Sequence, residues 1–150
     1  MDRENLIKLI SEKMKLVRTE ADFTQDHMAE ILGISKKTLV QIEKQRITAN
    51  WTTVAAFCSL FRDSQLLQSV LGGDPLEVVS IVAFEHYEGP LEKTMGGKVW
   101  WREIKNKGRF RLQQNLISKH YRILDEFDRR WSSSFDEDYI NKRLRELSSD

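Results

Sequence analysis

This sequence of 150 residues has few residues that form cross-links or interrupt helices and strands. It contains one cysteine, two prolines and seven glycines. The single cysteine, Cys58, excludes an intramolecular disulfide and fits the reducing cytoplasm. No apolar run approaches the roughly 18 uncharged residues of a membrane-spanning helix. The first residues also lack the basic flank and apolar stretch of a secretion signal. We therefore expect a cytoplasmic protein with no membrane segment.

Groups that carry catalysis or bind metals are also few. His27, His86 and His120 are scattered along the chain, and none lies at metal-ligand spacing from Cys58. The segment 96–98, Gly-Gly-Lys, lacks the remaining positions of a phosphate-binding loop. No paired carboxylates and no nucleophile next to a base stand out. We therefore expect no enzyme activity, no metal and no cofactor.

The net charge of +1 conceals an uneven distribution along the chain. Residues 1–72 carry ten basic and nine acidic side chains, and residues 73–97 carry one and five. Residues 98–130 carry ten and four, and residues 131–150 carry three and five. A phosphate backbone responds to local rather than total charge, so the basic stretch at 98–130 is a candidate for contact with nucleic acid.

The first 72 residues show apolar side chains at helical spacing. Cap and turn residues divide them into five expected helices, over about 6–17, 24–32, 35–43, 52–61 and 64–71. Thr24 and Ser35 are predicted N-caps of the second and third helices. Gly33 separates these two helices, because the residue just past a helix end often needs a positive φ. The sequence therefore predicts an all-α domain of five helices over residues 1–72.

The segment 72–75, Gly-Gly-Asp-Pro, ends one element and caps the next. We expect a linker over residues 73–97 that contains a helix at about 76–87. From Lys98 the apolar residues recur with a period of two, which indicates strands. The expected elements are two hairpins, 98–105 with 109–114 and 120–125 with 129–133, followed by a helix that Ser134 and Glu137 begin as a capping box. Residues 98–150 are thus predicted to form a small α+β domain with an antiparallel sheet.

The third expected helix has two chemically different sides. At about 100° per residue, its inner side carries Ser35, Leu39 and Ile42. Its outer side carries Lys36, Lys37, Val40, Gln41 and Lys44. Lysine can donate to guanine O6 and N7, glutamine can pair with adenine, and valine can touch a thymine methyl group. The outer side is therefore either a solvated face or a face that reads DNA bases.

The surrounding residues favour the second interpretation. Residues 18–61 resemble the helix-turn-helix of the Cro and phage-repressor (XRE) family at Thr24, Gln25, Ala29, Gly33, Ile34 and Ile42. The resemblance implies a lambda-repressor-like fold for residues 1–72 and a transcriptional regulator, acting as a repressor, that binds a double-stranded DNA operator as a homodimer. It also implies that Arg18 and Glu43 form a structural pair between the first and third helices.

Roles for individual residues follow from placing the third helix in the major groove. The expected base-reading residues are Lys36, Lys37, Val40 and Gln41. The expected phosphate contacts are Gln25, which the family also uses to buttress the third helix, and Lys44, Arg46 and Asn50. The sequence departs from the family at two loops: it has no glycine directly after the third helix and no proline before the fourth.

The resemblance does not extend to the C-terminal half, where the expected strands have an apolar and a basic side. The apolar side carries Phe110, Leu112, Tyr121 and Ile123, and the other side carries Arg109, Arg111, Gln113, His120 and Arg122. The arginines could be merely solvated. Arg109, Arg111 and Arg122 could instead form an accessory face for the DNA backbone, or part of a dimer or partner interface. An alternative function is therefore an antitoxin-like or adaptor protein whose basic sheet binds a protein partner.

Overall fold

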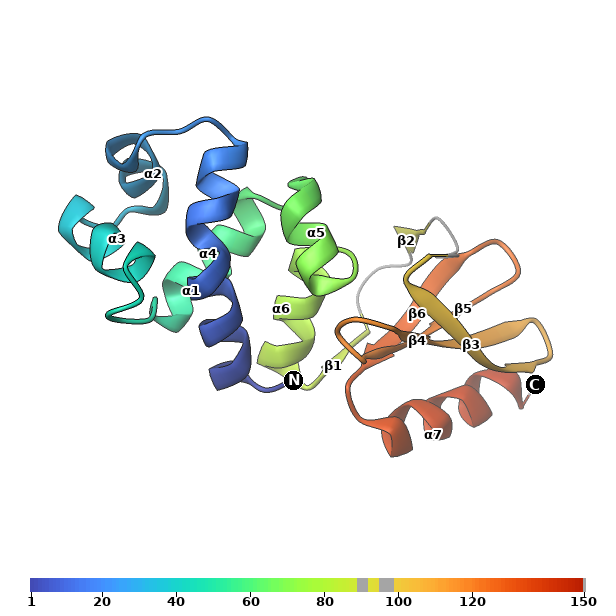
Figure 1. Ribbon diagram of the computed structural model, residues 1–150. Coiled ribbons are helices and arrows are strands. Elements are labelled where there is room, and N and C mark those ends of the chain that lie inside the picture. The colour runs from blue at the N-terminus through green and yellow to red at the C-terminus, as the bar shows by residue number, and fades with distance from the viewer. Residues whose placement is uncertain (89–91, 95–98, 150) are drawn as a thin grey trace. The chain divides into compact units, whose positions relative to one another are not determined.

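A computed structural model describes residues 1–88, 92–94 and 99–149 (Figure 1). The chain divides into two compact units, Met1–Val79 and Ser80–Asp150. The first unit is helical, and the second combines an antiparallel sheet with helix. Their boundary falls inside a helix, within the segment that was expected to be a linker between domains.

The first unit contains the five expected helices. They are α1 (Arg3–Glu20), α2 (Gln25–Leu32), α3 (Lys36–Glu43), α4 (Trp51–Leu60) and α5 (Gln65–Leu71). Each begins where a side chain accepts a hydrogen bond from a backbone N–H three residues further on. These capping residues are Asp2, Thr24, Ser35, Asn50 and Ser64. Short helices need such caps, because the first four N–H groups of a helix have no partner within it.

The core of the first unit is built on one side of α1. Leu6, Ile10 and Met14 recur at helical spacing and are fully buried. Cys58 on α4 is also fully buried, and burial raises the pKa of its thiol to about 12. A thiol with so high a pKa is a packing group rather than a nucleophile.

Helix α6 (Pro75–Phe84) follows α5 and carries the chain across the boundary between the units. It confirms the helix expected over 76–87 except at its end, where residues 86–87 are strand instead. No single helix in the described ranges is both long and apolar enough to cross a membrane. Helices α5 and α6 would reach that length only together, and they are bent by 43° at their junction.

The second unit contains a fully antiparallel sheet. Its strands are β1 (His86–Tyr87), β2 (Glu92–Lys93), β3 (Trp101–Lys107), β4 (Phe110–Asn115), β5 (Tyr121–Leu124) and β6 (Arg129–Ser134). The order is β1-β6-β5-β4-β3, and β2 also pairs with β6. Both expected hairpins are present, β3 with β4 and β5 with β6. Strands β1 and β2 were not expected, because they come from the segment interpreted as a linker.

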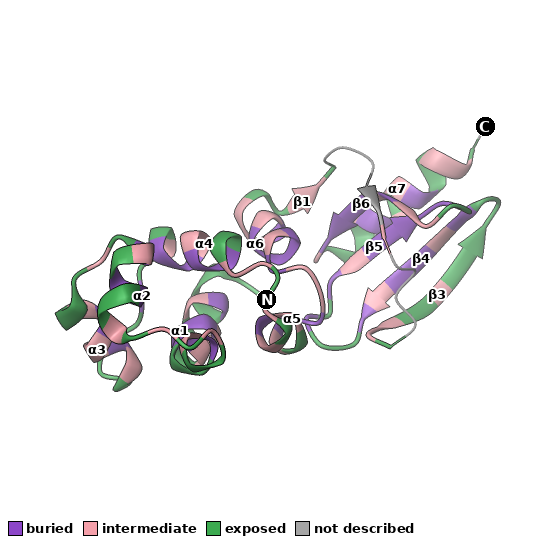
Figure 2. Ribbon diagram, turned by 90° about the horizontal axis from the view of Figure 1, so that it is seen from above, coloured by how far each residue is buried: buried purple, intermediate pink, exposed green. Residues whose placement is uncertain are grey.

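One face of this sheet is apolar, as the alternation predicted. Phe110, Leu112 and Ile123 pack with Ile140 and Leu144 of helix α7 (Glu137–Ser148). Figure 2 shows the resulting contrast between β3, which is mostly exposed, and the largely buried strands β4 to β6. The tertiary core of the second unit therefore depends on α7 lying against the sheet.

The expected capping box at the start of α7 is wrong. The N-cap is Asp136, whose carboxylate accepts the backbone N–H of Tyr139 at 3.1 Å. Ser134 is instead the last residue of β6, and its hydroxyl accepts the N–H of Asp136 at 2.9 Å. Both residues have cap chemistry, and β6 extends far enough to leave only the second of them for the helix.

Candidate nucleic-acid interface

Helices α2 and α3 are joined by a three-residue turn that begins at Gly33. Gly33 has φ of +70°, a backbone conformation that residues with a side chain rarely adopt. The next residue, Ile34, donates its N–H to the carbonyl of Ala29 at 3.0 Å. Ser35 then caps α3 by accepting the N–H of Thr38 at 3.0 Å. The direction of α3 relative to α2 is therefore set by local backbone geometry.

The outer side of α3 presents the side chains that were expected to read bases. Leu39 and Ile42 are buried on the inner side. Lys36 and Lys37, in the first turn, are exposed. Val40 and Gln41 are half-buried. The two lysines are thus the most accessible of the four, and the other two lie closer to the body of the unit.

The C-terminal end of α3 is held by a buried carboxylate. Arg18 donates from Nε to Glu43 Oε2 at 2.8 Å and from Nη2 to Glu43 Oε1 at 2.9 Å. The Gln25 amide donates to the same Oε1 at 3.1 Å, and Arg18 also reaches the carbonyl of Phe23 at 2.9 Å. The side chain of Glu43 is only 3% exposed, and its hydrogen bonds raise the pKa of Arg18 above the usual value.

This network ties three helices together at one point. Arg18 comes from α1, Gln25 from the first turn of α2, and Glu43 from the last turn of α3. A bidentate arginine–carboxylate pair fixes both distance and plane, which a single hydrogen bond would not. Gln25 therefore buttresses α3 through Glu43. Its amide nitrogen has a second N–H, so a phosphate contact could come from that group or from the backbone N–H without breaking the bond to Glu43.

The chain leaves α3 through a residue in the left-handed region. Gln45 has φ of +60°, at the place where the XRE family usually has glycine. Its N–H donates to the carbonyl of Ile42 at 2.9 Å, and that of Arg46 donates to Gln41 at 3.0 Å. A glutamine thus adopts the turn that glycine would adopt more easily. Lys44 and Arg46, the expected phosphate contacts on either side of it, are both exposed.

Asn50 has a structural task in addition to its expected phosphate contact. Its side-chain oxygen accepts the N–H of Thr53 at 2.8 Å and so caps α4. The following residue, Trp51, lies under the guanidinium of Arg3, 4.5 Å from the ring centroid. Two side-chain contacts thus hold the N-terminus of α4, at a position where XRE proteins commonly have a proline.

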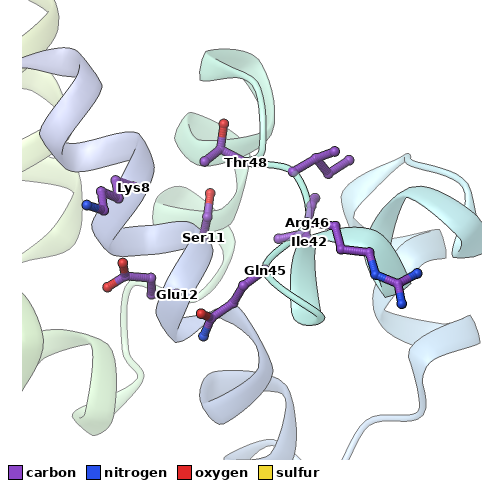
Figure 3. Close-up of a pocket in the computed structure, with 8 residues that line it drawn as sticks. Lys8, Ser11, Glu12, Ile42, Gln45, Arg46 and Thr48 are labelled. Carbon is purple, nitrogen blue, oxygen red and sulfur yellow. The ribbon is translucent and has the colours of Figure 1, made fainter.

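A hollow of about 310 Å³ lies between α1 and the segment after α3 (Figure 3). Figure 3 shows Lys8 and Arg46 on opposite sides of it, with their charged groups pointing apart. The hydroxyl of Ser11 within it already accepts the N–H of Ala49 at 2.9 Å. The polar groups of this hollow do not converge on one point, as a small-molecule site would require.

The ion pair between α2 and α3 was not expected from the sequence. Lys36 Nζ lies 3.2 Å from Asp26 Oδ2, and both side chains are exposed, at 55% and 74%. Ten residues separate the two in sequence, so helical spacing could not reveal the contact. The interface candidate therefore contains a carboxylate beside one of its lysines.

The structure corrects the expected basic face of the sheet. Arg122 is only 5% exposed, and its guanidinium lies 3.8 Å from the centroid of the Trp101 ring. Its Nε donates to Gln113 at 2.8 Å. Arg122 is thus withdrawn from any surface that could bind a phosphate backbone.

Arg109 and Arg111 are engaged with carboxylates of the same unit. Arg109 lies 3.3 Å from Glu126, and Arg111 pairs with Asp128 and lies 3.6 Å from Glu103. These acidic residues come from the β5–β6 turn and from β3. Counting charges along the sequence could not show this neutralisation, because the pairing of these charges depends on which strands are neighbours.

Asp125 is a further buried carboxylate that sequence reasoning missed. It is fully buried and accepts the backbone N–H groups of Phe127 and Arg129, the Nε of Arg129 and the indole N–H of Trp131, at 2.8 to 3.0 Å. Burial alone would raise the pKa of Asp125, but these hydrogen bonds lower it to about 2. An aspartate at the start of a turn between two strands is the signal that could have revealed it.

Glu88 joins β6 to α7 in a similar way. Its Oε1 accepts the hydroxyls of Ser132 at 2.8 Å and Tyr139 at 2.7 Å and the Nε of Arg143 at 3.1 Å. Burial, followed by this contact with Glu88, raises the pKa of Tyr139 to about 12. Glu88 thus holds elements of the second unit together, as Asp125 does.

The side chains that could bind a metal ion are scattered in the described part of the chain. Within the described ranges, no three His, Cys, Asp or Glu residues gather closely enough to hold a metal ion. The segment 96–98, Gly-Gly-Lys, lies outside the residues that the structure describes. Comparisons with protein-family models, with curated proteins and with solved structures give no significant match.

Proposed function

We propose that this chain is a sequence-specific DNA-binding protein that places α3 in the major groove of an operator. The resemblance of residues 18–61 to the XRE family suggests a lambda-repressor-like domain and a transcriptional regulator that acts as a repressor. The observation that carries the proposal is that side-chain hydrogen bonds hold α3 in a fixed position on α1 and α2. The bond network of Arg18, Gln25 and Glu43 anchors its end, while Lys36 and Lys37 extend from its first turn.

Physical reasons connect this geometry with base reading. Reading bases requires a helix held rigidly, because hydrogen bonds to base edges tolerate little displacement. The first turn of a recognition helix is the part that contacts base edges. Lys44 and Arg46, just beyond the helix, are suited to phosphates, which fix register without reading sequence.

Binding as a homodimer is part of the proposal. One recognition helix contacts only a few base pairs, and two copies on half-sites about 34 Å apart would double the contacts. The protein-partner alternative depended on an open basic sheet. Arg122 is buried and Arg111 is paired with carboxylates, so that alternative has lost its main support.

Selection of bound sequences from a pool of random duplexes tests the proposal directly. We expect enrichment of a palindrome with half-sites about one helical turn apart. Affinity should also fall steeply with salt concentration, as it does when several phosphates are contacted. A pool that shows no enrichment, together with no measurable duplex binding at low salt, would refute the proposal.

Lys37→Ala gives a residue-level test on the selected duplex. We expect binding to weaken by about 1–3 kcal/mol with loss of preference at one base position, because Lys37 would contact a base edge. Lys15→Ala is the matched control, since Lys15 is also exposed but lies on α1. Equal losses on selected and random duplexes would show instead that Lys37 contacts a phosphate.

A further inference from the structure

Asp26 places a negative charge on the face that the proposed function turns toward DNA. Its carboxylate lies 3.2 Å from Lys36 Nζ, and it belongs to the first turn of α2, next to Gln25. Exposed ion pairs of this kind add little to folding stability. The pair therefore matters mainly for DNA binding, because it lowers the positive charge of this face and fixes the position of the Lys36 ammonium group.

We infer that Asp26 is a specificity-determining residue that holds Lys36 away from the DNA phosphates. This inference rests on the proposed function and assigns a role to one more residue of the same site. Non-specific binding comes almost entirely from contacts between cations and phosphates. A lysine paired with Asp26 gains less by binding a phosphate, because the carboxylate already offsets its charge and itself repels phosphates.

The effect should differ between random and selected duplexes. On a random duplex, Lys36 can add to the affinity only by binding a phosphate, so pairing with Asp26 lowers its whole contribution. On the selected duplex, Lys36 faces a base edge in the groove and can keep its position beside Asp26. The carboxylate therefore lowers non-specific affinity more than specific affinity, and the ratio of the two rises.

Asp26→Asn should release Lys36 for one additional phosphate contact on random DNA. A slope of about −0.9 in log affinity against log salt per phosphate corresponds to about a fivefold gain at roughly 0.15 M salt. We expect that gain on random duplexes, a steeper salt slope there, and a smaller gain on the selected duplex. The ratio of specific to non-specific affinity should fall accordingly.

Two comparisons separate this role from a general change in charge. Asp63→Asn makes the same charge change at an exposed position between α4 and α5, and it should leave the affinity ratio unchanged. Lys36→Gln removes the partner, so Asp26→Asn added to it should no longer alter the ratio. Additive effects of the two substitutions would overturn the inference.

The outcomes also distinguish the inference from the proposed function. If the wild-type chain selects a duplex but Asp26→Asn raises binding equally on selected and random DNA, the inference alone fails. If the wild-type chain binds no duplex, the proposed function fails and the role of Asp26 fails with it. Circular dichroism of Asp26→Asn should match the wild type, since the side chain is 74% exposed.

Discussion

Replacing Arg18 with methionine removes the guanidinium that binds Glu43 and keeps an apolar stem of similar length. The carboxylate of Glu43 would retain the amide of Gln25 as its remaining side-chain donor among the contacts described above. It would also remain within an environment where its side chain is 3% exposed. The substitution therefore creates a buried charge without its counter-charge.

The expected magnitude follows from this burial. Removing one partner of a buried ion pair costs about 3–5 kcal/mol, because the other charge loses compensation but stays desolvated. The side chain of Arg18 is 15% exposed, so water can reach its place and solvate Glu43 in part. We therefore expect a loss near the lower end of that range, about 3 kcal/mol.

Hydrogen exchange of the full chain is a suitable assay, because it reports the opening free energy of each segment separately. We expect amides in α1, α2 and α3 to exchange faster in Arg18→Met, while those of β4 to β6 keep their protection. Lys15→Met, at an exposed position on α1, is the control for the loss of a positive charge.

A double-mutant cycle isolates the interaction itself. Arg18→Met combined with Glu43→Gln should be more stable than the sum of the two single losses predicts, by at least about 1 kcal/mol. A loss below about 1 kcal/mol for Arg18→Met, with no coupling to Glu43, would refute the view that this pair fixes α3. Unchanged stability with altered base preference would instead place Arg18 at the DNA.

Two further predictions concern stability. Gln45→Gly should be neutral or stabilising by up to about 1 kcal/mol in thermal unfolding, because it relieves a left-handed residue at φ +60°; a loss of stability would mean that the glutamine side chain makes a net contribution. The lowered pKa of Asp125 adds stability above about pH 4 that is lost as the pH falls toward 2. Asp125→Asn should thus destabilise the second unit by about 2 kcal/mol at neutral pH and flatten its acid denaturation between pH 4 and 2; a profile like that of the wild type would contradict this.

Local signals in the sequence were sufficient for the helical unit. Helices of seven to eighteen residues arise there from apolar spacing, and each begins at a cap whose chemistry acts within three residues. Gly33 and Ser35 could be placed for the same reason. The side chains on the outer side of α3 could also be predicted, because the 100° rotation per residue separates Lys36 and Lys37 from Leu39.

Prediction failed where the outcome depended on contacts between distant segments. Ser134 and Asp136 have the same capping chemistry, and the pairing of β6 decided between them. Strands β1 and β2 contain only two residues each, too few for any alternation to show, and pairing with β6 is what makes them strands.

The sequence by itself determined the helices, the turn at Gly33 and the side chains that α3 presents, because these depend on neighbours within a turn or two. Only the tertiary structure decided which charges are available for binding. It buried Arg122, gave carboxylate partners to Arg111, and set Asp26 beside Lys36. The physical reason is that charge acts through space, and distances in space depend on how the helices and strands pack.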